Sequence, residues 1–132
     1  MILDTSALIA MLKEESEAAV FKAALLNSPS RCISAASFLE ACIVVDGFKN
    51  PVLRARFDAI LQETNVEIES FTEEHARVAR LAYRDFGKGS GHPAQLNFGD
   101  CFSYALARVK REPLLYKGDD FVHTDVRAAV KL

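Results

Sequence analysis

Met1-Ile2-Leu3-Asp4-Thr5-Ser6-Ala7-Leu8-Ile9, the first stretch of the sequence, decides how the rest of the chain is interpreted. Its apolar run at positions 2 and 3 is too short for anything but a buried strand. Apolar residues then resume in a pattern that suits a helix capped by Thr5 or Ser6. Asp4 therefore stands where a buried strand gives way to a helix. It would either cap that helix or belong to a ligand site at the carboxyl end of the strand, and this stretch alone favours neither.

The composition is that of one globular domain covering residues 1–132. Half of the residues are apolar and 26% are charged, which excludes a disordered chain. The net charge of −2 excludes strong non-specific binding to nucleic acid through overall charge, but it allows a nucleic-acid enzyme whose metal ions supply positive charge at an acidic site. The three cysteines lack metal-ligand spacing, so free thiols in a reducing cytoplasm are expected. Because no apolar run approaches the roughly 20 residues that span a bilayer, we expect a cytoplasmic protein without membrane contact.

Strand and helix signals alternate along the whole chain. Short apolar or alternating runs predict further strands at 31–33, 66–69 and 114–116, with residues 126–130 as a candidate last strand. Between the strands, apolar stripes predict helices whose expected N-caps include Ser34, Asn50 and Thr72. The glycine-rich residues 87–93 are expected to form an exposed loop. The alternation predicts a three-layer α/β/α sandwich around a mainly parallel sheet of four to five strands.

Acidic residues follow or precede the predicted strands at several points: Asp4, Glu40, Asp100, Asp119 and Asp120. Each alone has an ordinary explanation, such as a helix cap, a solvated helix face or a Gly-Asp turn. In a parallel sheet, however, these positions converge on one edge, where we expect no Lys or Arg beside them to neutralise their charge. Such a cluster raises the pKa of at least one carboxyl group unless divalent cations bind between the charges. Oxygen ligands suit Mg²⁺ or Mn²⁺, and the pattern indicates metal-assisted phosphodiester hydrolysis.

The order of these motifs resembles that of the PIN-domain ribonucleases, and more closely that of the VapC toxins of type II toxin–antitoxin modules. The resemblance covers essentially the whole chain, and it is carried by Asp4-Thr5-Ser6, by Ser37 with Glu40, by Asn97-Phe98-Gly99-Asp100 and by Gly118-Asp119-Asp120-Phe121. It implies a metal site formed by Asp4, Glu40, Asp100 and one acid of the 119/120 pair. Asp119 is preferred for the fourth position because it is nearer the strand end, and the other residues in supporting roles are Ser6, Asn97 and Asp120.

The resemblance also implies an activity and partners. The family's members are Mg²⁺- or Mn²⁺-dependent endoribonucleases that cleave cellular RNA to arrest growth, and a VapB-type antitoxin neutralises them. They are usually homodimers within a larger toxin–antitoxin complex. The arginine stripe of Arg77, Arg80 and Arg84, or the apolar faces of the middle helices, could serve the dimer or RNA, although a solvated helix face is the simpler interpretation. The three histidines lack a shared spacing and are interpreted as surface or turn residues.

Three other functions match parts of this pattern, and the residues fit each of them less well. A haloacid-dehalogenase-type phosphatase needs a second Asp two residues after the first, and position 6 is Ser. A receiver domain needs an Asp after its third strand, where this chain has Ser70 and Phe71. The remaining alternative is a catalytically inactive PIN scaffold that binds RNA or an antitoxin without cleaving. The presence of all four acids favours the nuclease.

Overall fold

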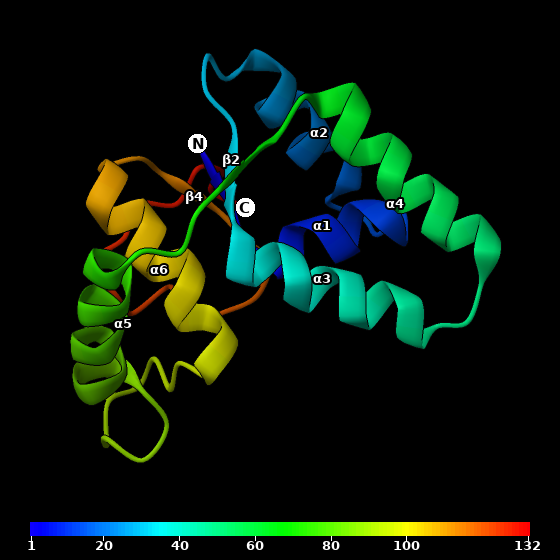
Figure 1. Cartoon of the computed structure of the whole chain (residues 1–132). Helices are drawn as coiled ribbons and strands as arrows, with labels where there is room; N and C mark the ends of the chain where they lie inside the picture. Colours follow the sequence, from blue (N-terminus) through cyan, green and yellow to red (C-terminus); the bar gives the residue numbers. More distant parts are fainter.

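A central sheet of four parallel strands organises the computed structural model, which describes residues 1–132. The strands are β1 (Ile2–Leu3), β2 (Cys32–Ser34), β3 (Glu67–Glu69) and β4 (Leu114–Leu115), and they lie in the order β3-β2-β1-β4. The helices are α1 (Thr5–Leu12), α2 (Ala18–Asn27), α3 (Ala35–Gly47), α4 (Pro51–Thr64), α5 (Glu73–Phe86) and α6 (Phe98–Lys110). Figure 1 shows α5 and α6 on one side of the sheet and α1, α3 and α4 on the other. The expected α/β/α sandwich with a parallel sheet is confirmed.

The sheet separates two hydrophobic cores, and successive strand residues point into opposite ones. Ile2, Cys32 and Leu114 belong to the core under α5 and α6. Leu3, Ile33 and Leu115 belong to the core under α1 to α4. Because side chains alternate along a strand, even two or three residues are enough to serve both layers. Every strand residue of β1 and β4 is buried, which explains why both strands read as purely apolar.

The expected helix caps at Ser34, Asn50 and Thr72 are confirmed. Their side chains accept hydrogen bonds from the backbone N–H of Ala36 at 3.3 Å, of Val52 at 3.0 Å and of His75 at 3.2 Å, respectively. The Ser34 cap means that α3 starts directly at the end of β2. Glu40 is therefore fixed within the first two turns of a helix that begins at the carboxyl edge of the sheet.

Two expectations about the fold are wrong, while β3 lies at the edge of the sheet and its apolar Ile68 is 52% exposed. Residues 126–130 form no strand; Ala128 makes only an isolated bridge to Leu114. His75 is buried rather than on the surface, and its ring packs edge-on against Phe71, with centroids 6.0 Å apart.

The loop 87–93 is exposed at most of its residues, as expected, but its base is closed. Gly87 bridges Leu96, and the Lys88 N–H donates to the Leu96 carbonyl at 2.9 Å. All three cysteines are free. No helix combines the length and the apolar character that crossing a membrane would require.

Candidate active site

Asp4 is nearly fully buried at the end of the central strand β1, and it is itself the N-cap of α1. Its Oδ2 atom accepts hydrogen bonds from the Ser6 N–H at 3.0 Å and from the Ser6 hydroxyl at 2.6 Å. The expectation that Thr5 or Ser6 caps this helix is therefore wrong. The carboxylate is the stronger acceptor for the unpaired N–H groups at a helix start, so Asp4 combines the two uses that the sequence left open: it caps the helix and it faces the carboxyl edge of the sheet.

Ser103, which no sequence motif indicated, holds the other oxygen of Asp4 and is itself held by Ser37. The Ser103 hydroxyl on α6 donates to Asp4 Oδ1 at 2.6 Å, and Ser37 Oγ on α3 lies 3.1 Å from Ser103 Oγ. Both serines are completely buried. Three hydrogen bonds thus fix the orientation of the Asp4 carboxylate, and Ser37 holds the Ser103 hydroxyl that makes one of them. The signal was present, because Ser103 is a polar residue one helical turn after Asp100 on an otherwise apolar helix.

Asp100 lies in the first turn of α6 and forms a capping box with Asn97. The Asn97 N–H donates to Asp100 Oδ2 at 2.9 Å, and the Asp100 N–H donates to Asn97 Oδ1 at 2.9 Å. Burial raises the pKa of Asp100 to about 7; the backbone hydrogen bond from Asn97 opposes this, and the charges of Asp4 and Asp120 add to it. Asp4 and Asp120 are therefore close enough to repel Asp100.

Asp120 is the member of the 119/120 pair that lies close to Asp100, because its charge contributes to the raised pKa of Asp100. Asp119 acts instead on Tyr116, whose pKa is raised mainly by burial and further by the Asp119 charge. Asp119 also lines a separate cavity with Glu17 and Tyr116. The structure therefore places Asp120 beside Asp100, in place of the preferred Asp119. Distance from the strand end was a poor guide because Gly118, with φ of +100°, turns the chain between the end of β4 and the two aspartates.

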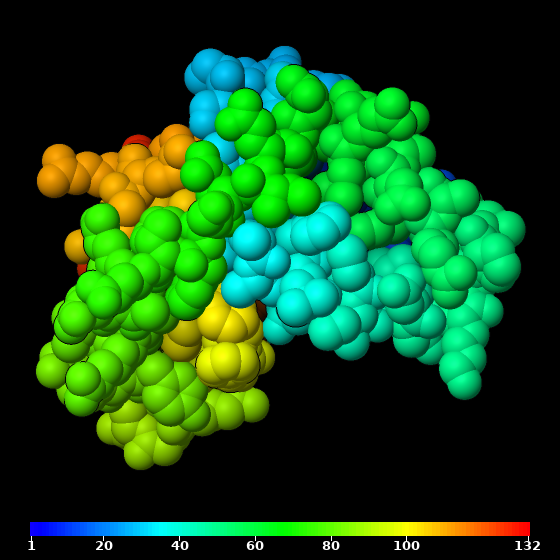
Figure 2. Space-filling view, in the orientation of Figure 1, coloured from blue at the N-terminus to red at the C-terminus, as the bar shows by residue number.

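Glu40 reaches the same place from α3. Its carboxylate lies so close to the Cα atom of Gly99 that a Cβ atom there would overlap Glu40 Oε2 and lie 2.9 Å from Glu40 Cδ. Gly99 directly precedes Asp100 in α6. The missing side chain at position 99 thus leaves the space in which the Glu40 carboxylate lies against the first turn of α6. Figure 2 shows the start of α6 and the helix α3 on either side of a notch between the two halves of the molecule.

The four acids at this edge have no cationic partner in the protein. None of the salt bridges in the structure includes Asp4, Glu40, Asp100 or Asp120. Asp4 and Asp100 are buried, whereas Glu40 is half-buried and Asp120 is exposed. Buried like charges without a counter-ion are unfavourable, and divalent cations with oxygen ligands relieve that repulsion. The donor set and its uncompensated charge fit Mg²⁺ or Mn²⁺.

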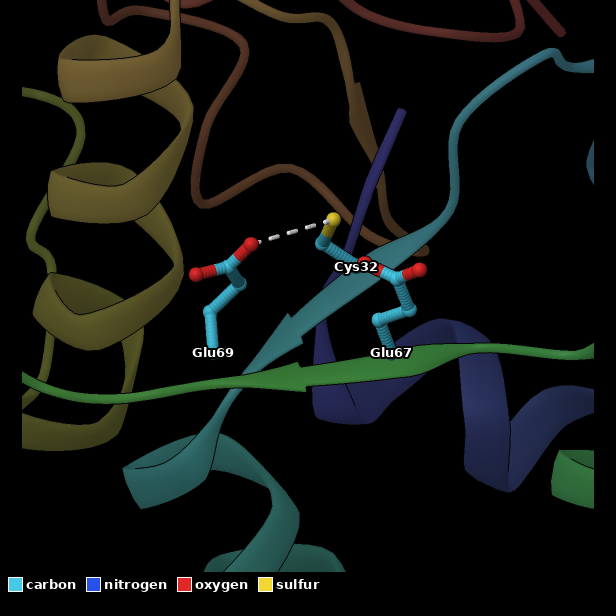
Figure 3. A group of neighbouring side chains, drawn as sticks. All are labelled: Cys32, Glu67 and Glu69. Carbon is cyan, nitrogen blue, oxygen red and sulfur yellow. Dashed lines mark hydrogen bonds between the residues drawn. The ribbon is translucent and has the colours of Figure 1, made fainter.

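A second group of possible ligands lies elsewhere. Cys32 on β2 and the two glutamates of β3, Glu67 and Glu69, place donor atoms within 4.8 Å of one another (Figure 3). The Cys32 thiol donates to Glu69 Oε1 at 3.8 Å, and Lys110 Nζ donates to the same oxygen at 2.9 Å. Lys110 thus already supplies the positive charge here. This group differs from the acids at the sheet edge, which have no such partner.

The raised pKa of Asp100 predicts how the stability of the metal-free protein depends on pH. The unfolded chain releases this proton near pH 4, while the folded protein holds it up to about pH 7. Between these values the folded state binds more protons, so the free energy of unfolding falls as pH rises. We expect the melting temperature in EDTA to be higher at pH 5 than at pH 7.5. Differential scanning fluorimetry measures this, and an equal or higher melting temperature at pH 7.5 would contradict it.

Comparison with known proteins places the chain in a family. The PIN domain model matches residues 1–127. Ribonuclease VapC28 of Mycobacterium tuberculosis is 55% identical over 130 residues, and Ribonuclease VapC42 of the same species is 48% identical over 129; each comparison covers 98% of both chains.

Solved structures with low sequence identity share the fold. A toxin–antitoxin complex from Klebsiella pneumoniae contains a chain that is 22% identical, with a TM-score of 0.70 over 99% of this chain and 98% of that one. The VapC20 toxin of M. tuberculosis, which cleaves the sarcin–ricin loop, is 19% identical, with a TM-score of 0.67 over 96% of this chain and 98% of that one. The motifs, the fold and the level of identity agree, and the chain belongs to the PIN-domain family, among the VapC ribonucleases.

Proposed function

We propose that this protein is the toxin of a type II toxin–antitoxin module and acts as a Mg²⁺- or Mn²⁺-dependent endoribonuclease on cellular RNA. The observation that carries the proposal is the set of carboxylates at the carboxyl edge of the sheet, Asp4, Glu40, Asp100 and Asp120, which have no cationic partner. Family membership supports the same activity, because the relatives that match over nearly the whole chain are named ribonucleases. A PIN scaffold that had lost activity would have no need to keep this repulsive group together.

In this proposal the four acids hold the metal, with Asp120 in place of Asp119. The bound ion would supply a Lewis acid that activates water and stabilises charge on the phosphate. The chain's own residues orient the acids. Ser6 and Ser103 fix both oxygens of Asp4. Asn97 holds Asp100 Oδ2, which leaves Oδ1 of Asp100 free to face the other acids. These partners act as the outer shell that keeps carboxylate ligands in place.

The proposed partners are a VapB-type antitoxin, the RNA substrate and a second copy of this chain. The antitoxin tail would place a basic residue among the four acids and so provide the missing positive charge. A groove of about 300 Å³ lined by residues of α1, α2 and α4, among them Met11, Ala18 and Ile60, offers an apolar seat for its helix. The homodimer is proposed to use the face of α3 on which Leu39 and Ile43 are 59% and 64% exposed. The location of such a complex would be the cytoplasm.

Metal removal tests the proposed activity. The purified protein, freed of antitoxin and treated with EDTA, is expected to leave RNA intact, and added Mg²⁺ or Mn²⁺ should restore internal cleavage. The measurement is the appearance of discrete fragments from an end-labelled RNA, with DNA of the same sequence as a comparison. Cleavage that persists in EDTA would exclude the metal mechanism. RNA binding without cleavage at any metal concentration would favour the inactive scaffold.

A further inference from the structure

We propose that Lys117 is a positioning residue that fixes the acid-bearing loop 117–120 against both Asp4 and the turn between α1 and α2. This inference rests on the proposed nuclease function. Lys117 lies two residues after β4, and its side chain pairs with Glu15 and Glu17 and not with any of the four acids. Its two ends are held by different parts of the molecule, and this double attachment carries the inference.

The backbone attachment runs through Ser6. The Lys117 N–H donates to Ser6 Oγ at 3.0 Å, and the Ser6 hydroxyl in turn donates to Asp4 Oδ2 at 2.6 Å. A hydroxyl group has one proton, so its direction is set when it accepts from one neighbour and donates to another. The Lys117 backbone thereby directs the Ser6 proton toward Asp4. A loop that moved away would release the Ser6 hydroxyl and loosen the Asp4 carboxylate.

The side-chain attachment runs to the turn between α1 and α2. Lys117 Nζ forms ion pairs with Glu15 and with Glu17, the second at 3.4 Å. Glu17 Oε2 is buried and has no hydrogen-bond partner of good geometry, and the Lys117 ammonium is the cation that pairs with it. The two glutamates hold one cation from two positions, which restricts the lysine more than a single surface pair would.

The loop then has little freedom before it reaches Asp120. Gly118 adopts φ of +100°, a conformation that suits glycine, and the chain turns there toward α6. Asp120 follows two residues later and interacts with Asp100. Lys117 is thus the last fixed point before the fourth acid. Losing its ion pairs is expected to misplace Asp120 and Asp4 together, although Lys117 itself contacts neither substrate nor metal.

The test compares two lysines whose ion pairs resemble each other. Lys117→Met removes the proposed anchor. Lys110→Met removes the ion pair between Lys110, at the end of α6, and Glu69 on β3. The side chains of Lys117 and Lys110 are 38% and 30% exposed, respectively. We expect Lys117→Met to weaken Mn²⁺ binding, measured by calorimetry on the full-length protein, and to lower kcat, each about 10-fold or more. KM for RNA should stay within about twofold, and Lys117→Arg should restore most of both losses. Lys110→Met should change neither Mn²⁺ affinity nor kcat.

Each outcome decides the question. Equal Mn²⁺ affinity and kcat in Lys117→Met and Lys110→Met would overturn the positioning role while leaving the nuclease intact. Wild-type protein that neither binds Mn²⁺ nor cleaves RNA would instead remove the proposed function and this inference with it. If Lys117→Met does not fold, the double variant Glu15→Gln/Glu17→Gln removes the same ion pairs from the other side. Unchanged Mn²⁺ affinity and kcat in that variant would equally overturn the proposal.

Discussion

Asp100→Asn is expected to abolish RNA cleavage and, at the same time, to raise the melting temperature of the metal-free protein at neutral pH. Asparagine keeps the acceptor oxygen that the Asn97 N–H needs, so the capping box of α6 survives. What disappears is a buried charge that Asp4 and Asp120 repel. Removing it relieves the repulsion in the folded state, whereas the unfolded chain gains nothing comparable.

The loss of activity should reach about 1000-fold or more, because a metal ligand contributes several kcal/mol to the stabilisation of the transition state. The fall in melting temperature between pH 5 and pH 7.5 should also become shallower in this variant. Cleavage assays and fluorimetry in EDTA measure the two effects. A melting temperature of Asp100→Asn below that of the wild type in EDTA at neutral pH would contradict the assignment of Asp100 as an uncompensated buried charge.

Gly99→Ala is the second large effect, and it separates activity from stability in a different way. Alanine is a better helix residue than glycine by about 1 kcal/mol, so α6 by itself would gain stability. The new Cβ atom, however, would overlap the Glu40 carboxylate. Glu40 has a flexible side chain that can rotate away, so the fold tolerates the change. The carboxylate is then lost from the acids at the sheet edge.

We expect Gly99→Ala to lower kcat about 100-fold with the melting temperature within a few degrees of wild type, because a displacement of about 1 Å at a catalytic group has effects of that size. The control is Gly47→Ala at the end of α3, where an added Cβ would meet nothing within 4 Å. That variant should keep full activity. If Gly99→Ala cleaved RNA as fast as Gly47→Ala, Glu40 would have no role in the site.

The sequence predicted where most of the acids meet, for a reason that lies in the topology. Asp4 and Glu40 follow parallel strands, Asp100 starts the helix before the last strand, and strand ends of a parallel sheet share an edge. The choice between Asp119 and Asp120 depended on the turn at Gly118, whose dihedral angle no pattern of residues reports. The sequence shows that both aspartates follow β4, but the turn at Gly118 decides which of them lies beside Asp100.

The residues that the sequence did not reveal act through contacts between distant segments. Ser103 reaches Asp4 across 99 positions, and the role of Gly99 appears only when α3 brings Glu40 against it. His75 was interpreted as a surface or turn residue because the histidines lack a shared spacing, whereas its ring is buried and packs against Phe71. Sequence patterns over a few residues predict helices and their caps well. They do not predict which side chains of two distant helices come into contact.

The pairing of β1 with both β2 and β4 has a consequence for when the protein becomes active during its synthesis. Ile2 pairs with Cys32 and with Leu114. The Lys117 N–H that directs the Ser6 hydroxyl comes 111 positions after Ser6 in the chain. A ribosome-bound chain that ends before residue 114 contains Asp4, Glu40 and Asp100 but lacks the strand and the loop that complete the centre. The four acids of the proposed site can therefore come together only after residues 114–120 have left the ribosome, so a nascent chain that ends before this segment lacks the complete site.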